Sequence, residues 1–177
     1  MTQASAAPSG AGFALENRVA TARAFSDIYA ETHVHRLASF FGAFRKALQA
    51  STRSSDERIA VLSPGPANET YFEHAYIARY LGIMLLEGED LTIVNGKVMV
   101  RTVAGLKPVS VLWRRLDAAF ADPLELDQNS YIGTPGMVQA LRNGAVTFVN
   151  ALGSGILETR ALLAFMPTLS RHLLGEE

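Results

Sequence analysis

The chain has 177 residues, of which 49% are hydrophobic and 19% charged, and it contains no cysteine. A chain of this length and composition buries enough surface for one globular domain, which excludes disorder as the main state and makes disulfides unnecessary. The formal net charge is −1, from 16 Lys and Arg against 17 Asp and Glu. This balance gives no electrostatic footprint for nucleic acid or for an anionic membrane.

The first residues carry no targeting signal. Residues 1–12 (MTQASAAPSGAG) have neither the basic start nor the apolar core of a secretory signal peptide. Uncharged stretches such as 143–157 are broken by Gly, Asn and Ser and fall short of the roughly 20 apolar residues that span a membrane. We therefore expect a cytoplasmic protein. Because small uncharged side chains pack poorly, residues 1–13 are predicted to be a flexible lead-in.

Residues 14–57 are predicted to be helical. Apolar residues recur at steps of three and four, which is typical of an amphipathic helix over about 35–50. One or two shorter helices precede it, and the polar run 51–57 (STRSSDE) ends the segment. The apolar positions are Leu37, Phe40, Phe41, Phe44 and Leu48.

An α/β pattern begins at Arg58. The short apolar runs 58–62 and 83–87 are typical of buried strands. The helix between them is predicted to start at Asn68, whose side chain can cap it, and to end at Gly82. A strand, a helix and a strand joined by short loops form a parallel, right-handed unit in nearly all proteins.

The remaining sequence adds a hairpin, two strands and further helices. Residues of alternating apolar and polar character flank Asn95-Gly96. This dipeptide favours the type I′ turn of a hairpin. The hairpin strands are predicted at 91–94 and 97–100, other strands at 109–113 and 145–149, and helices at 134–142 and, with a break at Pro167, 157–174.

The predicted fold class is α/β, with a small, mostly parallel sheet of four strands, an appended β-hairpin and helices on both faces. Residues 58–177 are expected to form this domain together with its C-terminal helices. Ligands of such sheets bind beyond the carboxyl ends of the strands. Three unusual loops follow predicted strands and are therefore expected at one edge: Ser63–Glu69, Arg114–Asp117 and Asn150–Glu158.

The first loop places Gly65 between two prolines and leads into a helix. The backbone N–H groups of the first helical turn could receive an anionic group there, which makes Gly65, Asn68 and Glu69 candidate binding residues. A Pro-Gly turn into a helix also needs no ligand, and Asn68 is then simply the cap.

The second loop contains a dense charge cluster, Arg114, Arg115 and Asp117. Arginine suits bidentate binding of carboxylate or phosphate. Neighbouring residues of a strand point to opposite sides, so only one of the two arginines is expected to face the ligand edge easily. The alternative is an Arg–Asp pair that holds the loop.

The third loop carries Gly153 and Gly155 around Ser154, shortly after Asn150. Such a glycine-flanked turn before a helix can approach a phosphate or carboxylate closely. It is neither a dinucleotide fingerprint nor a P-loop, because GxGxxG is incomplete and GK[ST] is absent. An ordinary turn from strand to helix explains it equally well.

No metal site and no catalytic residue are predicted. In the acidic run 87–90 (EGED), Glu87, Glu89 and Asp90 could chelate a cation, but acidic residues before a hairpin are more typical of a solvated loop. No Ser-His-Asp grouping can be argued from the sequence. The histidines are either two residues apart, on different faces of a helix, or isolated; they are His33, His35, His74 and His172.

Taken together, five stretches resemble the circularly permuted ATP-grasp proteins related to glutathionylspermidine synthetase, formerly domains of unknown function. They follow one another over nearly the whole chain. These stretches are PSGAGFALENR (8–18), SPGPANETYFEHAYIARYLG (63–82), LWRRLDAAFADPLEL (112–126), GTPGMVQALRNGAV (133–146) and NALGSGILE (150–158).

The resemblance implies that residues 58–149 form the Rossmann-like pre-ATP-grasp domain. Members of the family are longer, and this chain looks like an internal fragment without the magnesium ligands and the nucleotide-gripping lysines. The implied function is part of an ATP-dependent carboxylate–amine ligase that forms peptide or amide bonds. ATP and magnesium would be the cofactors of the full-length protein, with none expected for the fragment, which would be inactive alone.

By the same resemblance, the three loops would hold the acceptor substrate, a small molecule or a peptide, or an acylphosphate oxygen. Glu16, Asn17 and Arg18 would lie on the nucleotide side. The other implied partners are the missing lobes of the parent chain and a second copy, which Phe40 and its neighbours could contact if they are not intramolecular core. The alternative function is a non-catalytic binding or interaction domain that keeps the fold.

Overall fold

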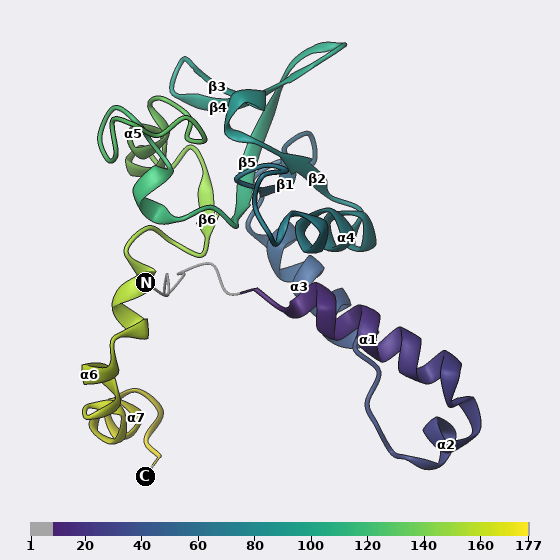
Figure 1. Ribbon diagram of the computed structural model, residues 1–177. Coiled ribbons are helices and arrows are strands. Elements are labelled where there is room, and N and C mark those ends of the chain that lie inside the picture. Colours follow the sequence, from purple (N-terminus) through teal and green to yellow (C-terminus); the bar gives the residue numbers. More distant parts are fainter. Residues whose placement is uncertain (1–8, 177) are drawn as a thin grey trace.

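The computed structural model describes residues 9–176 and shows a mixed α/β fold with a six-stranded open sheet flanked by helices (Figure 1). Residues 1–8 of the predicted lead-in lie outside the described part. Helix α1 (Ala11–Ala24) begins three residues before the expected helical start at Ala14.

The sheet has the order β2-β1-β5-β4-β3, with β6 also paired to β5. Four strands run parallel, as predicted, because β1 pairs with β2 and β5, and β5 pairs with β6. The antiparallel hairpin of β3 and β4 extends the sheet next to the first half of β5. The strands are β1 (Arg58–Leu62), β2 (Met84–Leu86), β3 (Leu91–Val94), β4 (Lys97–Thr102), β5 (Gly105–Arg114) and β6 (Thr147–Val149).

The hairpin turn has the predicted conformation, with positive φ at both Asn95 (51°) and Gly96 (73°). Strand β5, in contrast, starts four residues before the predicted Val109. Its first residues, Gly105 to Pro108, have low strand propensity, but pairing with β4 overrides that propensity.

The helices after α1 mostly follow the expected positions, and α4 ends at Gly82 with a left-handed φ of 65°. The break between the last two helices was predicted at Pro167 but lies at Ala164 and Phe165. Pro167 instead occupies the first turn of α7, where its missing N–H costs nothing. These helices are α2 (Ser26–Glu31), α3 (Ala38–Ala50), α4 (Tyr71–Leu81), α5 (Met137–Arg142), α6 (Arg160–Leu163) and α7 (Met166–Leu174).

Two apolar clusters cover the sheet on opposite faces, because alternate residues of a strand point to opposite sides. Leu112 of β5 belongs to the cluster that contains α5, whereas Trp113 belongs to the cluster under α1, α3 and α4. Phe44 packs edge-on against Trp113 at 4.7 Å between ring centroids, and Phe41 is buried. Both are therefore intramolecular core, while Phe40 stays 61% exposed.

The last helices, α6 and α7, extend away from the sheet (Figure 1), and none of their residues is buried. No helix among the described residues is long and apolar enough to cross a membrane.

Candidate functional site at the carboxyl edge of the parallel strands

The three predicted loops start side by side, because β1, β5 and β6 are parallel neighbours. The N–H of Arg115 donates to the carbonyl of Leu62 at 2.8 Å, which joins the ends of β5 and β1. The Nε of Arg114 donates to the carbonyl of Asn150 at 3.2 Å, which joins the ends of β5 and β6. The beginnings of all three loops therefore share one edge of the sheet.

Arg114 is fully buried and cross-links two of these loops. Besides Asn150, its guanidinium donates to the carbonyl oxygens of Leu116 and Ala151. Asp117 lies in the same loop and accepts a hydrogen bond from the N–H of Ala119 at 3.0 Å. Burial lowers the pKa of Arg114, and the charge of Asp117 partly opposes that shift. The side chain of Arg114 thus fixes the positions of loops 114–117 and 150–151.

Arg115 points to the other face, as strand alternation requires. Its side chain is 4% exposed and its Nη2 lies 3.9 Å from Oε1 of Glu73, whose own side chain has no exposed surface. The guanidinium also lies 5.3 Å from the ring centroid of Trp113, a favourable cation–π distance. Burial lowers the pKa of Arg115, and the negative charge of the Glu73 carboxylate partly opposes that shift.

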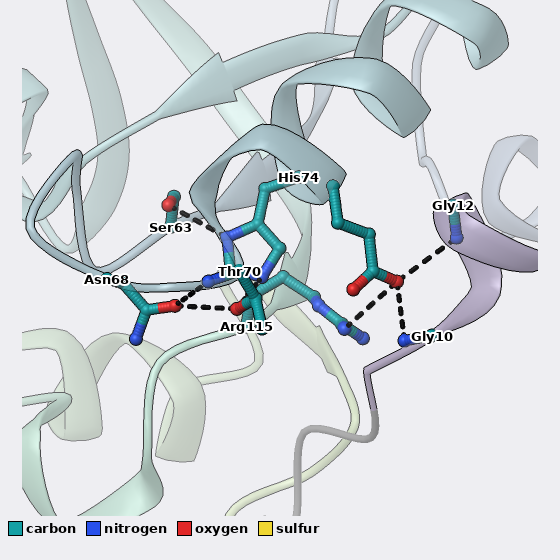
Figure 2. Close-up of polar contacts among 8 residues, drawn as sticks. Gly10, Gly12, Ser63, Asn68, Thr70, His74 and Arg115 are labelled. Atoms are coloured by element: carbon teal, nitrogen blue, oxygen red, sulfur yellow. Dashed lines mark hydrogen bonds and ion pairs between the residues drawn. The ribbon is translucent and has the colours of Figure 1, made fainter. Parts of the chain in front are cut away.

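Glu73 lies in the first turn of α4 and holds the start of α1. Its Oε1 accepts hydrogen bonds from the N–H groups of Gly10 at 2.7 Å and Gly12 at 3.1 Å (Figure 2). A carboxylate is stabilising at the positive N-terminus of a helix. A Cβ on Gly12 would lie only 2.6 Å from Cγ of Glu73, so this close approach requires glycine. The other oxygen, Oε2, is buried without a hydrogen-bond partner among the described residues.

A chain of hydrogen bonds ties the loop after β1 to α4 (Figure 2). The N–H of Gly65 donates to Ser63 Oγ at 3.2 Å, and Ser63 Oγ lies 3.0 Å from Nδ1 of His74. Nε2 of His74 lies 3.1 Å from Thr70 Oγ1, which donates to Asn68 Oδ1 at 2.6 Å. Because an amide oxygen only accepts, the Thr70 hydroxyl must donate to it and accept from Nε2–H. His74 is therefore assigned the Nε2–H tautomer, with Nδ1 accepting from Ser63.

His74 is a neutral, structural histidine. Burial first, and the charge of Arg115 second, lower its pKa to about 4, while Glu73 partly opposes the shift. The interpretation of His74 as isolated is wrong, because Ser63 and Thr70 bond both of its ring nitrogens. No local signal in the sequence joins residues 63 and 74.

The expected cap at Asn68 is also wrong. Helix α4 begins at Tyr71, and Asn68 Oδ1 accepts from the N–H of Thr70 at 2.9 Å, in a turn that precedes the helix. Gly65 is buried at φ 98°, and a Cβ there would lie 2.8 Å from Oε2 of Glu87. Glu69 is exposed.

Glu87 follows β2 directly and brings the acidic run 87–90 to the same edge. Burial first, and the neighbouring Asp90 and Glu89 next, raise the pKa of Glu87. The run is therefore only partly a solvated loop, because the carboxylate of Glu87 packs against Gly65. Among the side chains that the structure describes, no group of three or more acidic or histidine residues is arranged to hold a metal ion.

The glycine-flanked Ser154 is the first residue of a short 3₁₀ helix (Ser154–Glu158) and does not lead directly into an α-helix, so the expected α-helix N-terminus is missing at this loop. Gly153 has a left-handed φ of 82°, and Gly155 is exposed. The Ser154 hydroxyl oxygen is buried and has no hydrogen-bond partner within the described part of the chain.

Glu16, Asn17 and Arg18 lie on α1, beyond the glycines that contact Glu73, and not on the three loops. A hydrogen bond with Glu16 raises the pKa of Tyr76 on α4. Nη1 of Arg18 donates to the carbonyl of His35 at 3.3 Å, and Asn17 is exposed.

An α/β sheet with polar loops at the carboxyl ends of its parallel strands is found in a broad class of ligand-binding domains. Comparison with known proteins identifies the family within this class. The family model for circularly permuted ATP-grasp type 2 proteins matches residues 1–177, and the chain belongs to this family. An uncharacterized protein of Mycobacterium tuberculosis is 45% identical over 172 residues, covering 96% of this chain and 20% of the relative.

Two further relatives are more distant. A second uncharacterized M. tuberculosis protein is 36% identical, over 96% of this chain and 31% of its own length. An uncharacterized protein of Synechocystis is 34% identical, over 96% of this chain and 36% of its own length. The chain therefore spans between a fifth and little more than a third of the curated relatives that it matches.

Proposed function

We propose that this chain is part of an ATP-dependent carboxylate–amine ligase that resembles glutathionylspermidine synthetase and acts in the cytoplasm. In this proposal, ATP phosphorylates a substrate carboxylate with loss of ADP. An amine then attacks the acylphosphate, forming an amide bond and releasing phosphate and a proton. Membership of the permuted ATP-grasp family supports the reaction class.

The observation that carries the proposal is the position of Arg115 at the edge where the three loops begin. At 3.9 Å, its contact with Glu73 is an ion pair beyond ordinary hydrogen-bond length, so the pair leaves guanidinium N–H donors for a ligand. A cation fixed in a site of low dielectric stabilises the oxygens of an acylphosphate better than one in water. Arg115 would hold such an oxygen, and backbone N–H groups near Gly65 and Gly153 would complete the contacts.

The described residues contain no group of three or more acidic or histidine side chains that could hold a metal ion, so nothing in this part of the molecule supplies a complete protein site for magnesium. In a magnesium-dependent ligase, metal ligands would belong to other parts of the full-length protein, as would the grip on ATP. The proposal therefore gives this chain a role in binding the acceptor and no turnover of ATP by itself.

The test is amine-dependent ADP release by the full-length gene product. Arg115→Lys keeps the charge but removes the planar fork of donors, so we expect a loss of about tenfold or more in rate. Arg142→Lys is the matched control, because Arg142 pairs with Glu125 on the exposed surface. An unchanged rate in Arg115→Lys and Arg115→Ala would remove this residue from the mechanism.

A second candidate is a binding domain without catalysis. It is favoured by the full burial of Arg114 and its use in holding main-chain carbonyls. A full-length product that binds a substrate but releases no ADP would support this candidate. Exposed apolar side chains of α6 and α7, such as Leu163, Leu173 and Leu174, would then contact the rest of a longer chain or a second copy.

A further inference from the structure

A groove of about 430 Å³ lies between α1, α2, the start of α3 and the end of α4. None of the described residues that line it belongs to the three loops at the sheet edge. Its volume falls within the range of roughly 300–1,000 Å³ that is usual for small-molecule sites. The groove is therefore large enough for a ligand of its own.

The floor of the groove is part of the packed core. Leu15 is 3% exposed and belongs to the apolar cluster that includes Trp113, and Leu37 packs against the same cluster. The ring of Tyr80 on one wall is held edge-on by Phe41, with 5.4 Å between centroids. An apolar surface built on core side chains exists before any ligand binds.

The charged residues that line the groove have a single sign. Arg18 and Arg36 line it, and no aspartate or glutamate is among the lining residues that the structure describes. Arg18 is oriented by its hydrogen bond to the carbonyl of His35. Ser26 and Tyr29 also line the groove, and the hydroxyl of Ser26 donates to the carboxylate of its neighbour Asp27 at 3.2 Å. Apolar walls with two guanidinium groups match a ligand that has an apolar body and one negative charge.

We propose that this groove binds a small aromatic carboxylate. The ring lies against Leu15 and Leu37, and the carboxylate accepts hydrogen bonds from Arg18 and Arg36. This inference does not use the sheet edge, and the competition with ATP described below separates it from the nucleotide role that the family resemblance implies for Arg18.

The experiment is calorimetric titration of the 177-residue chain with 2-naphthoate, using 2-naphthamide as an isosteric neutral control. We expect the carboxylate to bind at least about fivefold more tightly than the amide, since only the carboxylate carries a negative charge that the two guanidinium groups attract. Arg36→Gln should weaken 2-naphthoate binding about tenfold. Arg23→Gln, on α1 but outside the groove lining, should leave it unchanged.

A second variant tests the location of the ligand. Ala22→Trp places a large side chain in the groove from the partly exposed face of α1 and should abolish binding while thermal unfolding confirms that the variant is folded. Equal affinity for acid and amide, or unaltered binding in both Arg36→Gln and Ala22→Trp, would overturn the proposal. Competition by ATP would overturn it too, because the groove would then belong to the nucleotide.

Discussion

Two adjacent arginines at the end of β5 are similarly buried but have different surroundings. Arg114 donates to three main-chain carbonyls of loops 114–117 and 150–151. Arg115 lies against a carboxylate and an indole ring on the opposite face. The difference shows that one strand end can supply both a structural cross-link and a buried cation balanced by a carboxylate.

The largest expected effect on the free energy of unfolding comes from replacing Arg115, and it distinguishes the surroundings of Arg115 from those of Arg114. Arg115→Met leaves the carboxylate of Glu73 buried without its cation, so we expect a loss of about 3 to 5 kcal/mol in the free energy of unfolding. Adding Glu73→Gln should recover much of that loss, since the amide oxygen can still accept from Gly10 and Gly12. Chemical denaturation of the single and double variants gives the coupling energy.

Arg114→Met provides the matched comparison. It leaves main-chain carbonyls without donors, so it should also destabilise the fold by about 3 kcal/mol, at roughly 1 to 3 kcal/mol for each unsatisfied group. Glu73→Gln should bring no recovery in this background. Equal recovery of the Arg114 and Arg115 variants would mean that the two arginines share one environment.

A smaller change in the free energy of unfolding is expected when pH is lowered, because His74 resists protonation in the folded protein. Its pKa is lowered to about 4 from the ordinary 6.5 in the folded protein, so the unfolded chain binds more protons between these values. The free energy of unfolding should therefore fall as pH drops from 6.5 towards 4, by about 2 to 3 kcal/mol in full. Denaturation at several pH values measures it.

The contribution of His74 is isolated by comparison between variants, because carboxylates titrate in the same range. His74→Gln should flatten the pH dependence, whereas His172→Gln, on the exposed face of α7, should leave it unchanged. A slope that is identical in the wild type and in His74→Gln would show that His74 takes up its proton normally in the folded state.

Gly12→Ala is expected to lower the free energy of unfolding by a similar or slightly smaller amount than acidification does through His74. The added Cβ would meet Cγ of Glu73 at 2.6 Å, so α1 or Glu73 must shift, at about 1 to 3 kcal/mol. Gly42→Ala in α3 is the control, because a Cβ there meets nothing within 4 Å, and it should stabilise by about 0.4 to 1 kcal/mol. If both variants gained stability in thermal denaturation, the docking of α1 on Glu73 would be disproved.

Local patterns predicted the elements well where neighbours in sequence decide the structure. The parallel unit of β1, α4 and β2 and the turn at Asn95-Gly96 depend on short-range signals, and both are present. The early start of β5 depends on pairing with β4, which composition does not reveal.

The polar contacts at the sheet edge could be predicted only in part. The order of strands explains why the three loops start together, and alternation explains why Arg114 and Arg115 diverge. The contact of Glu73 with Gly10 and Gly12 joins residues 63 and 61 positions apart and depends on how closely two helices approach. The same holds for the groove, whose walls come from four helical elements.

The most direct measurement is amine-dependent ADP release by full-length protein that carries Glu73→Gln and Arg115→Met together. Removing both charges keeps the buried site neutral, so the variant should remain folded by circular dichroism. If Arg115 holds an acylphosphate oxygen, the rate should fall about a hundredfold or more. A folded double variant that releases ADP at the wild-type rate would contradict the account.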